Sequence, residues 1–329
     1  MTKGEIGTLK AYGLNSSIGS KKRAKSCRSS YSVTGTPALV SSLVSSGGVH
    51  MRPSVLAGLL AASLSGIVLG QQPAPAPQAA AASAKPALTD AQMEDFLLHA
   101  KVVKTKSASK GITGSMRATL TDGKLTHDAH IQTIDERKQQ FVGQNGGVEF
   151  DFRDSWEFNI AGYEVDRLIG MNMVPVSVDR RWNYHEAAFT WWLDDVMMDE
   201  EARLKKKEEP PDIGIWNQQM QMVRTFDELI ANVDRNLGNL IITRDWRLWP
   251  IVHTRAFRTN HELRKPANVT RADRAVIERM KTLDKETLRK ATGKYLTTFQ
   301  IDAILARRDA IVKRLEGLGP AALFERTGW

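Results

Sequence analysis

The sequence has almost no cysteine and only one long apolar run. Its single cysteine among 329 residues is Cys27, so the rest of the chain can form neither an intrachain disulfide nor a thiolate metal site. Aromatic residues make up 7% of the chain, hydrophobic residues 42% and charged residues 25%, an ordinary globular composition. The chain can therefore form one large or two small domains that depend on packing for stability.

An excess of negative charge is also missing, but the positive charge is local. Of the formal charge of +9, residues 1–70 supply +7, because they hold eight Lys or Arg side chains and one acidic residue, Glu5. The remaining chain carries a net charge of +2. Net charge alone therefore indicates no polyanion-binding surface, and no nucleic-acid partner is expected.

The one apolar run is VLAGLLAASLSGIVLG, residues 55–70, which follows Met51-Arg52 and precedes the polar QQPAPAPQ. A bilayer span needs about 20 residues, so this run is short for one. Residues 51–70 are predicted to be a secretory signal, with a retained anchor at residues 53–70 as the first alternative and a buried core helix as the second.

Two low-complexity segments flank this run. Residues 1–50, rich in Ser, Gly and Lys, are expected to be a non-native or disordered leader before a true start at Met51, or alternatively a genuine targeting extension. Residues 71–87 are rich in Pro and Ala and predict a flexible linker. The protein is expected to be exported, periplasmic or secreted, and to meet a membrane only through the N-terminal anchor.

The folded region is predicted to span residues 88–329 and to begin with a helix. Thr89-Asp90-Ala91-Gln92 is a capping box ahead of apolar residues at helical spacing. The alternating stretch ITGSMRATLTDGKLTHDAHIQTID predicts two strands joined at Asp122-Gly123, with residues 110–114 as the loop before the first strand.

The following segments are shorter. Asp154-Ser155 is predicted to cap a helix that ends at Gly170. Residues 173–178 suit an edge strand or a connector, residues 189–193 a strand, and residues 200–209 a solvated charged helix stopped by Pro210-Pro211.

The second half of the folded region is mostly helical. From Phe226 the pattern predicts a helix, a loop and two short strands, and beyond Thr270 apolar residues recur three and four positions apart. The fold class expected is α+β and bilobal, with a small β-rich N-lobe at about residues 100–180 and a mostly helical C-lobe at about residues 181–329.

The residues that point to chemistry lie in the loop after the helix FDELIAN. Phosphoryl transfer needs a carboxylate that orients or deprotonates the acceptor hydroxyl, and oxygen ligands that hold magnesium. Asp234 and Asn239 lie five positions apart on this loop and provide these two groups. The same residues also suit a plain turn after an amphipathic helix, because Asp, Asn and Gly favour turns.

At these residues the chain resembles the atypical kinases of the phosphatidylinositol 3-/4-kinase and HipA-like group, whose catalytic loop reads Asp-Arg-His-x-x-Asn. Asp234-Arg235-Asn236-Leu237-Gly238-Asn239 matches this pattern except for Asn236 in place of histidine. The resemblance implies a bilobal protein-kinase-like fold, ATP with Mg or Mn as cofactors, Asp234 as the catalytic base and Asn239 as a metal ligand. The acceptor would be a protein, a lipid or a small molecule.

The resemblance also reveals departures from the family. The second metal ligand, usually an Asp, is expected thirteen positions after Asn239, where this chain has Val252. Valine offers no lone pair, whereas magnesium binds proteins chiefly through one or two carboxylates.

In the N-lobe, KGITGSMRATLTDG resembles the glycine-containing hairpin over the phosphates, so Gly111 and Gly114 are candidate cofactor-binding residues. Gln132 is the third, at the place of the phosphate-binding lysine. Asn159 takes the place of the family's glutamate, for which Glu157 and Glu164 are nearby substitutes.

Three functions follow from these patterns. The chain is an ATP-dependent phosphotransferase, a pseudokinase that serves as a binding or scaffolding module, or a structural envelope protein with no nucleotide site. Val252, Gln132 and Asn159 favour the pseudokinase.

Other side chains have two interpretations each. His253 is a structural residue or a metal ligand, and Arg255 and Arg258 pair with carboxylates of the helical lobe or hold phosphate; the first reading is favoured for both. Core packing is likewise favoured over an aromatic platform for six tryptophans: Trp182, Trp191, Trp192, Trp216, Trp246 and Trp249.

Overall fold

In the computed structural model, which describes residues 88–107, 115–143 and 146–329, the chain opens with helix α1 (Asp90–His99). Thr89 Oγ1 accepts a hydrogen bond from Gln92 N at 3.3 Å, and Gln92 Oε1 accepts one from Thr89 N at 2.9 Å. The predicted capping box is therefore confirmed. The leader, signal and linker predicted for residues 1–87, and Gly111 and Gly114, lie outside the described residues.

Five antiparallel strands form the first sheet, in the order β1-β2-β3-β7-β6. They are β1 (Lys101–Ser107), β2 (Met116–Thr121), β3 (Thr126–Gln132), β6 (Ser177–Trp182) and β7 (His185–Trp191). The β2–β3 hairpin turns at the predicted Asp122-Gly123, where Gly123 has φ +88° and the Asp122 carboxylate accepts bonds from two following amides. The sheet continues to Trp191, and a linker of residues 192–195 leads into the next sheet.

A second hairpin, β4 (Asp135–Val142) and β5 (Val148–Ser155), follows β3 in the chain and precedes helix α2 (Glu157–Ile169). The prediction that Asp154-Ser155 caps this helix is wrong, because both residues belong to β5 and the N-cap is Trp156, with no side-chain cap bond. Ser155 N instead donates to Thr254 O at 2.9 Å. Gly170 ends α2 as predicted, with φ 68°.

The segment predicted as an edge strand or connector is both. Residues 173–176 are irregular, and the chain enters β6, an edge of the five-stranded sheet, at Ser177. The strand predicted at residues 189–193 lies earlier in the chain, because β7 covers His185–Trp191.

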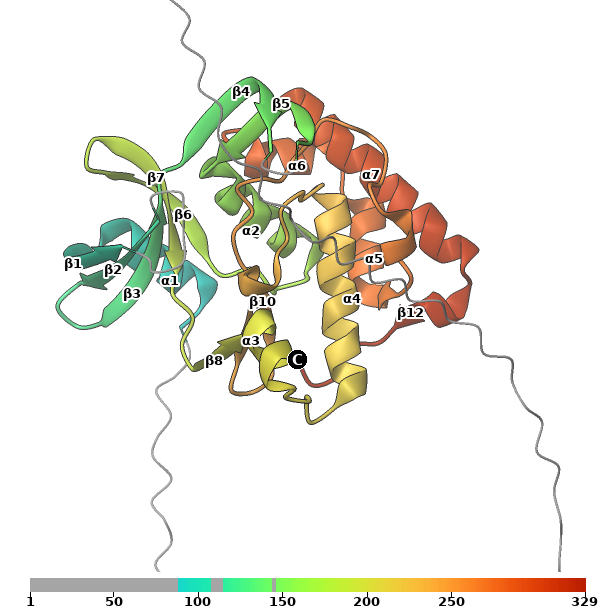
Figure 1. Ribbon diagram of the computed structural model, residues 1–329, viewed down its shortest axis with the longest axis horizontal. Coiled ribbons are helices and arrows are strands. Elements are labelled where there is room, and N and C mark those ends of the chain that lie inside the picture. Colours follow the sequence, from blue (N-terminus) through green and yellow to red (C-terminus); the bar gives the residue numbers. More distant parts are fainter. Residues whose placement is uncertain (1–87, 108–114, 144–145) are drawn as a thin grey trace, which may run out of the picture. The chain divides into compact units, whose positions relative to one another are not determined.

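The C-terminal part begins with a three-stranded sheet in the order β10-β9-β8 and contains most of the helices. Figure 1 shows α2 between the five-stranded sheet on one side and α4 to α7 on the other. The elements are β8 (Val196–Asp199), α3 (Glu200–Lys206), α4 (Ile213–Leu229), β9 (Leu240–Thr243), β10 (Leu248–Pro250), α5 (Arg274–Thr282), α6 (Lys285–Thr292) and α7 (Thr298–Gly317), with a short parallel pair, β11 (Ala272–Asp273) and β12 (Leu323–Phe324). The chain thus has the bilobal α+β architecture predicted from the sequence.

Helix α3 corrects one expectation about the charged stretch at residues 200–209. Glu200 and Arg203 are buried, and Arg203 Nε donates to Glu200 Oε2 at 2.6 Å. The Arg203 guanidinium also lies 5.0 Å from the ring centroid of Trp216. One face of this helix is therefore an internal contact and not a solvated surface. The attraction between the two paired charges offsets part of the free-energy cost of burying them.

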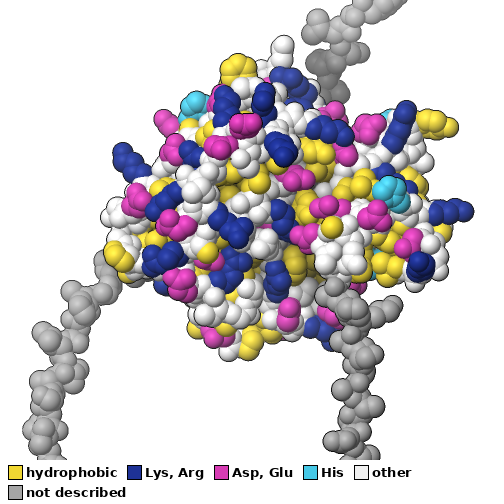
Figure 2. All heavy atoms as spheres, turned by 180° about the vertical axis from the view of Figure 1, so that it is seen from behind, with side chains coloured by type: hydrophobic (Ala, Val, Ile, Leu, Met, Phe, Trp, Pro, Cys, Tyr) yellow, Lys and Arg dark blue, Asp and Glu magenta, His cyan; other side chains and the backbone are white. Residues whose placement is uncertain are grey.

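One hydrophobic core runs through both parts of the described chain, from Phe96 and Leu97 of α1 to Leu315 of α7. On the outside, Figure 2 shows Lys and Arg side chains interspersed with Asp and Glu over the face opposite to that of Figure 1. Within the three described ranges, no helix has both the length and the apolar composition that a membrane crossing requires.

Candidate active site

The loop after α4 is held in shape by its own amides. Asn232 donates from Nδ2 to Asp227 Oδ1 at 3.1 Å, and its Oδ1 accepts from Asp234 N at 3.1 Å. Asn236 Oδ1 accepts from Asn239 N at 3.1 Å and caps a single 3-10 turn, Leu237–Asn239. These are the backbone roles that Asn and Asp commonly take in turns, and they fix Asp234 and Asn239 relative to each other.

Arg235 ties this loop to the segment after β10. Its guanidinium pairs with Asp227 at 3.0 Å and also donates to Ile251 O at 2.5 Å and Asn239 O at 3.3 Å. The Arg235 and Asp227 side chains are only 12% and 14% exposed, so solvent screens the pair weakly. Arg235 therefore positions two segments of the site at once, the loop after α4 and the segment after β10, a role that the motif by itself does not specify.

Asp234 and Asn239 line a cleft of about 830 Å³ between the five-stranded sheet and the C-terminal part. Gln132, Asn159 and Val252 line the same cleft, so the fold brings together residues from four separate segments. Of the five candidate site residues, three are thus gathered at this cleft, while Gly111 and Gly114 lie outside the described residues.

Val252 lies in the left-handed backbone region, with φ 59°. A β-branched residue is a genuine outlier in this region, because its Cβ substituents clash with the backbone. Ile251 N, next to it, donates to Asn239 O at 2.9 Å and so fixes the segment beside the loop. The backbone at position 252 therefore has a conformation that Asp, Asn or Gly would adopt at lower cost.

The two polar residues that replace an expected ion pair are both neutral and both engaged. Gln132 Oε1 accepts from Thr133 N at 3.1 Å, and Asn159 Oδ1 accepts from His253 N at 2.7 Å. The second bond connects α2 to the segment that contains Val252. Glu157 and Glu164, the substitutes considered for Asn159, are not among the residues that line the cleft.

His253 is packed into the core. Its side chain meets the Phe226 ring edge-on at 5.7 Å, and the residue is 1% exposed. Burial, and then the nearby Arg235, lower the pKa of His253 well below its usual value, so the imidazole is neutral. Packing against Phe226 accounts for the ring, but His253 also lines the cleft and its Nε2 has no hydrogen-bond partner among the described residues.

Arg255 and Arg258 pair with a carboxylate, as favoured from the sequence. Arg255 Nη2 lies 2.5 Å from Glu149 Oε2, and Arg258 pairs with the other oxygen of the same carboxylate. The predicted location of the partner is wrong, because Glu149 belongs to β5 and not to the helical lobe. The β4–β5 hairpin is thereby fastened to the chain that follows Val252.

The tryptophans divide into two groups. Trp182 meets Phe189, and Trp216 meets Trp246, both edge-on in packing contacts. Trp191 and Trp192 line the cleft beside the linker, and the Arg117 guanidinium lies 4.3 Å from the Trp192 ring centroid. Packing therefore accounts for part of the set, while two rings border the candidate site.

Asp154 is a cleft residue that the sequence reasoning assigned to a helix cap. It lines the same cleft as Asp234, at the end of β5, and is 9% exposed. Burial raises the pKa of Asp154, and the charge on Asp234 adds to this rise, whereas a bond with Thr254 and the charge on Arg255 oppose it. The alternation of side chains along β5 could have indicated that Asp154 is buried, because Asp154 lies on the same buried face as Phe152.

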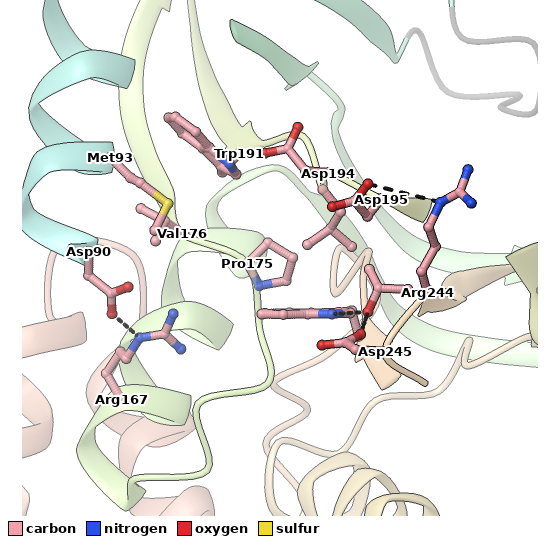
Figure 3. Close-up of a pocket in the computed structure, with 13 residues that line it drawn as sticks. Asp90, Met93, Arg167, Pro175, Val176, Trp191, Asp194, Asp195, Arg244 and Asp245 are labelled. Atoms are coloured by element: carbon pink, nitrogen blue, oxygen red, sulfur yellow. Dashed lines mark hydrogen bonds and ion pairs between the residues drawn. The ribbon is translucent and has the colours of Figure 1, made fainter. Parts of the chain in front are cut away.

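A second pocket of about 470 Å³ shares Pro175 and Trp191 with the wall of this cleft (Figure 3). Its charged walls are partly paired, with Arg167 Nε 2.6 Å from Asp90 and Arg244 Nε 4.0 Å from Asp195. Neither Asp234 nor Asn239 lines this pocket. The larger cleft is therefore the candidate active site.

The donor set of the cleft suits a hard cation only in part. No group of three or more His, Cys, Asp or Glu side chains that could hold a metal occurs in the described part of the chain. Asp234 offers a carboxylate and Asn239 an amide oxygen at one cleft. Magnesium commonly uses one or two carboxylates and takes its other ligands from substrate phosphates and water, so the residues fit a cation that arrives with a nucleotide.

The sequence matches no protein-family model and no curated protein. Solved structures do match. The structure of hydra Fam20 with sugar aligns with a TM-score of 0.54 and 16% identity over 71% of this chain and 92% of that chain. The Golgi casein kinase with Mn/ADP bound aligns with a TM-score of 0.51 and 13% identity over 72% of this chain and 78% of that chain.

These neighbours and the element order define a kinase-like α+β fold, with a β-sheet N-terminal part and a helical C-terminal part. The fold predicted from the sequence is confirmed at this level. At these identities the likeness concerns the fold alone, and it does not establish the particular grouping with phosphatidylinositol and HipA-like kinases.

Proposed function

We propose that this domain is a phosphotransferase of the atypical-kinase type that binds ATP with Mg²⁺ or Mn²⁺ in the 830 Å³ cleft. The observation that carries the proposal is the shared placement of Asp234 and Asn239 on a loop that Arg235 holds against Ile251. Two of the groups that phosphoryl transfer requires are thereby fixed at one cleft.

In this proposal Asp234 accepts the proton of the acceptor hydroxyl, whose oxygen then attacks the γ-phosphorus as ADP leaves. Asn239 would hold a divalent cation, which would supply positive charge against the phosphates. Gln132 lines the cleft and carries no charge, so the chain itself supplies less electrostatic stabilisation than a lysine there would. Slow transfer is expected.

A pseudokinase that acts as a binding or scaffolding module is the second candidate. Three positions of the cleft favour it, namely Val252, Gln132 and Asn159, since none provides a charge. Loss of a single preorganised group costs roughly 10²-fold to 10³-fold in rate, and these losses act on one site. Export, expected from residues 51–70, is part of either proposal, and the name of the Golgi casein kinase is in keeping with it.

The first test is a thermal shift of the purified full chain with ATP, with and without Mg²⁺ or Mn²⁺. Ligand at about a hundred times its dissociation constant stabilises a fold by about 2.7 kcal/mol, which raises the melting temperature visibly. We expect a metal-dependent rise that Asn239→Ala removes. Asp309→Asn, an exposed side chain of α7, is the control and should keep the rise.

The second test separates the two candidates. Phosphoryl transfer to water or to added acceptors is followed with labelled ATP, and Asp234→Asn is expected to lower its rate roughly 10²-fold or more while ATP still binds. ATP binding with no transfer in the wild type would leave the pseudokinase. Absence of any nucleotide effect on the melting temperature would contradict the phosphotransferase and leave the binding or scaffolding module.

A further inference from the structure

The cleft contains a carboxylate that the kinase pattern does not assign. With Asp234 assigned as the base, a divalent cation held by Asn239 would have no charged protein ligand, and Val252 cannot supply one. Asp154 comes from a different element, β5, and lines the same cleft. It lies 80 positions before Asp234 in the sequence, so only the fold brings the two carboxylates to one site.

The position of Asp154 is fixed by the segment that contains Val252. Ser155 N donates to Thr254 O at 2.9 Å, which joins the end of β5 to the chain two residues beyond Val252. Asn159, four residues after Ser155, accepts a hydrogen bond from His253 N. Two hydrogen bonds therefore hold this stretch against the chain where the family's metal carboxylate would stand.

The Asp154 carboxylate is incompletely satisfied. It is 9% exposed, and its Oδ1 has no hydrogen-bond partner among the described residues. The carboxylate has a bond with Thr254, and the Arg255 charge lies near it. A buried carboxylate oxygen without a partner costs free energy, so a positive ligand at this place would be stabilising.

We infer that Asp154 supplies, from β5, a carboxylate for a divalent cation in this cleft, together with the amide oxygen of Asn239, while Asp234 stays free to act as the base. The inference rests on the proposed metal–nucleotide function of the cleft. It accounts for a cation site without an acidic residue at position 252, because the missing charge comes from a strand and not from the segment after β10. The competing explanation is that Asp154 serves only to bond Thr254 and balance Arg255.

The test is titration of the full chain with Mn²⁺ alone and with Mn²⁺ plus ATP, followed by calorimetry. Asp154→Asn should weaken Mn²⁺ affinity at least about tenfold, while Asp154→Glu keeps a carboxylate and should retain binding. Asp309→Asn is the control, because Asp309 is an exposed carboxylate of α7 that does not line the cleft. It should bind Mn²⁺ as the wild type does.

The outcomes distinguish this inference from the function on which it rests. Equal Mn²⁺ affinity of Asp154→Asn and wild type, with ATP still bound, overturns the inference and leaves the proposed function intact. Failure of ATP to bind the wild type defeats the proposed function, and the titration with Mn²⁺ alone then decides the role of Asp154.

A second measurement covers the case in which Asp154→Asn does not fold. In the isotope-labelled wild-type chain, paramagnetic Mn²⁺ should broaden the amide signals around Asp154, Asp234 and Asn239 at low occupancy and spare those of α7. Broadening around Asp234 that leaves Asp154 and Ser155 sharp would overturn the inference.

Discussion

The loop that ends at Asn239 and the segment around Val252 are neighbouring walls of one cleft, yet they keep the kinase pattern to different degrees. The loop keeps Asp234, Arg235 and Asn239, with their supporting bonds. The segment has a left-handed backbone at position 252 and a valine where the resemblance leads us to expect an Asp. The comparison teaches that backbone geometry and ligand chemistry can separate, because hydrogen bonds from Arg235 and Asn159 hold the segment regardless of the side chain at position 252.

The largest effect on this comparison is expected from Arg235→Ala, which removes the connection between the two walls. Asp227 would be left without its partner in a weakly screened place, and the free energy of unfolding should fall by about 3 kcal/mol. Urea denaturation measures this loss. Arg244→Ala is the control, since its pair with Asp195 is exposed and long, and little change is expected. Equal losses in the two variants would contradict a positioning role for Arg235.

Asn159→Ala should have the next largest effect, because it removes the acceptor of the buried His253 amide. An unsatisfied buried donor costs about 2 kcal/mol, which denaturant unfolding would resolve. Asn159→Asp retains an acceptor oxygen and should restore part of the loss. If Asn159→Ala were as stable as the wild type, the hydrogen bond between α2 and the Val252 segment would contribute nothing to the free energy of unfolding.

Val252→Asp tests the segment after β10, because it introduces the Asp that the kinase resemblance predicts at this position. The left-handed backbone costs a β-branched residue about 1 kcal/mol more than it costs Asp, so stability should rise by that amount. Mn²⁺ affinity should rise roughly tenfold, as expected for an added ligand. Val252→Thr keeps the β-branch without a carboxylate and should gain neither. Calorimetry with Mn²⁺ and thermal unfolding measure both changes.

The smallest expected effect is a pH dependence from Asp154. Burial raises its folded-state pKa above the usual value of 3.8, so its contribution to stability is fully present below that value and is lost as pH rises through the folded pKa. Relative to Asp154→Asn, the wild type should therefore lose stability as pH rises from about 4. Asp122 should have the opposite effect, because bonds from the Leu125 and Lys124 amides lower its pKa. Relative to Asp122→Asn, the wild type should gain stability as pH rises. Denaturation midpoints across this pH range, compared with both variants, would reveal the two slopes.

Local patterns predicted the parts of the fold that local forces determine. The Thr89–Gln92 capping box, the turn at Asp122-Gly123 and the end of α2 at Gly170 depend on a few neighbouring residues, and all three are confirmed. The strand β1 and the β4–β5 hairpin were not predicted. β4 reads DERKQQFV, is exposed along most of its length and so lacks the apolar alternation that marks a half-buried strand.

Two wrong predictions share one cause. The preference of Asp and Ser for helix N-caps predicts a cap at Asp154, and the run of charges predicts a solvated helix at Glu200; both patterns are local and do not include the distant partners. Thr254 and Arg255 neighbour the first and Arg203 pairs with the second, so both carboxylates are buried. These neighbours include residues a hundred positions away, and no local pattern identifies them.

The sequence by itself determined the change from a β-rich first half to a helical second half, the kinase-like pattern of the Asp234–Asn239 loop and the absence of an acidic residue at position 252. Only the tertiary structure decided which side chains share the cleft. Gln132, Asp154, Asn159 and Asp234 meet there because the first sheet, the β4–β5 hairpin and α2 pack around the segment after β10. Burial and long-range hydrogen bonds set that arrangement, and both depend on residues distant in the chain.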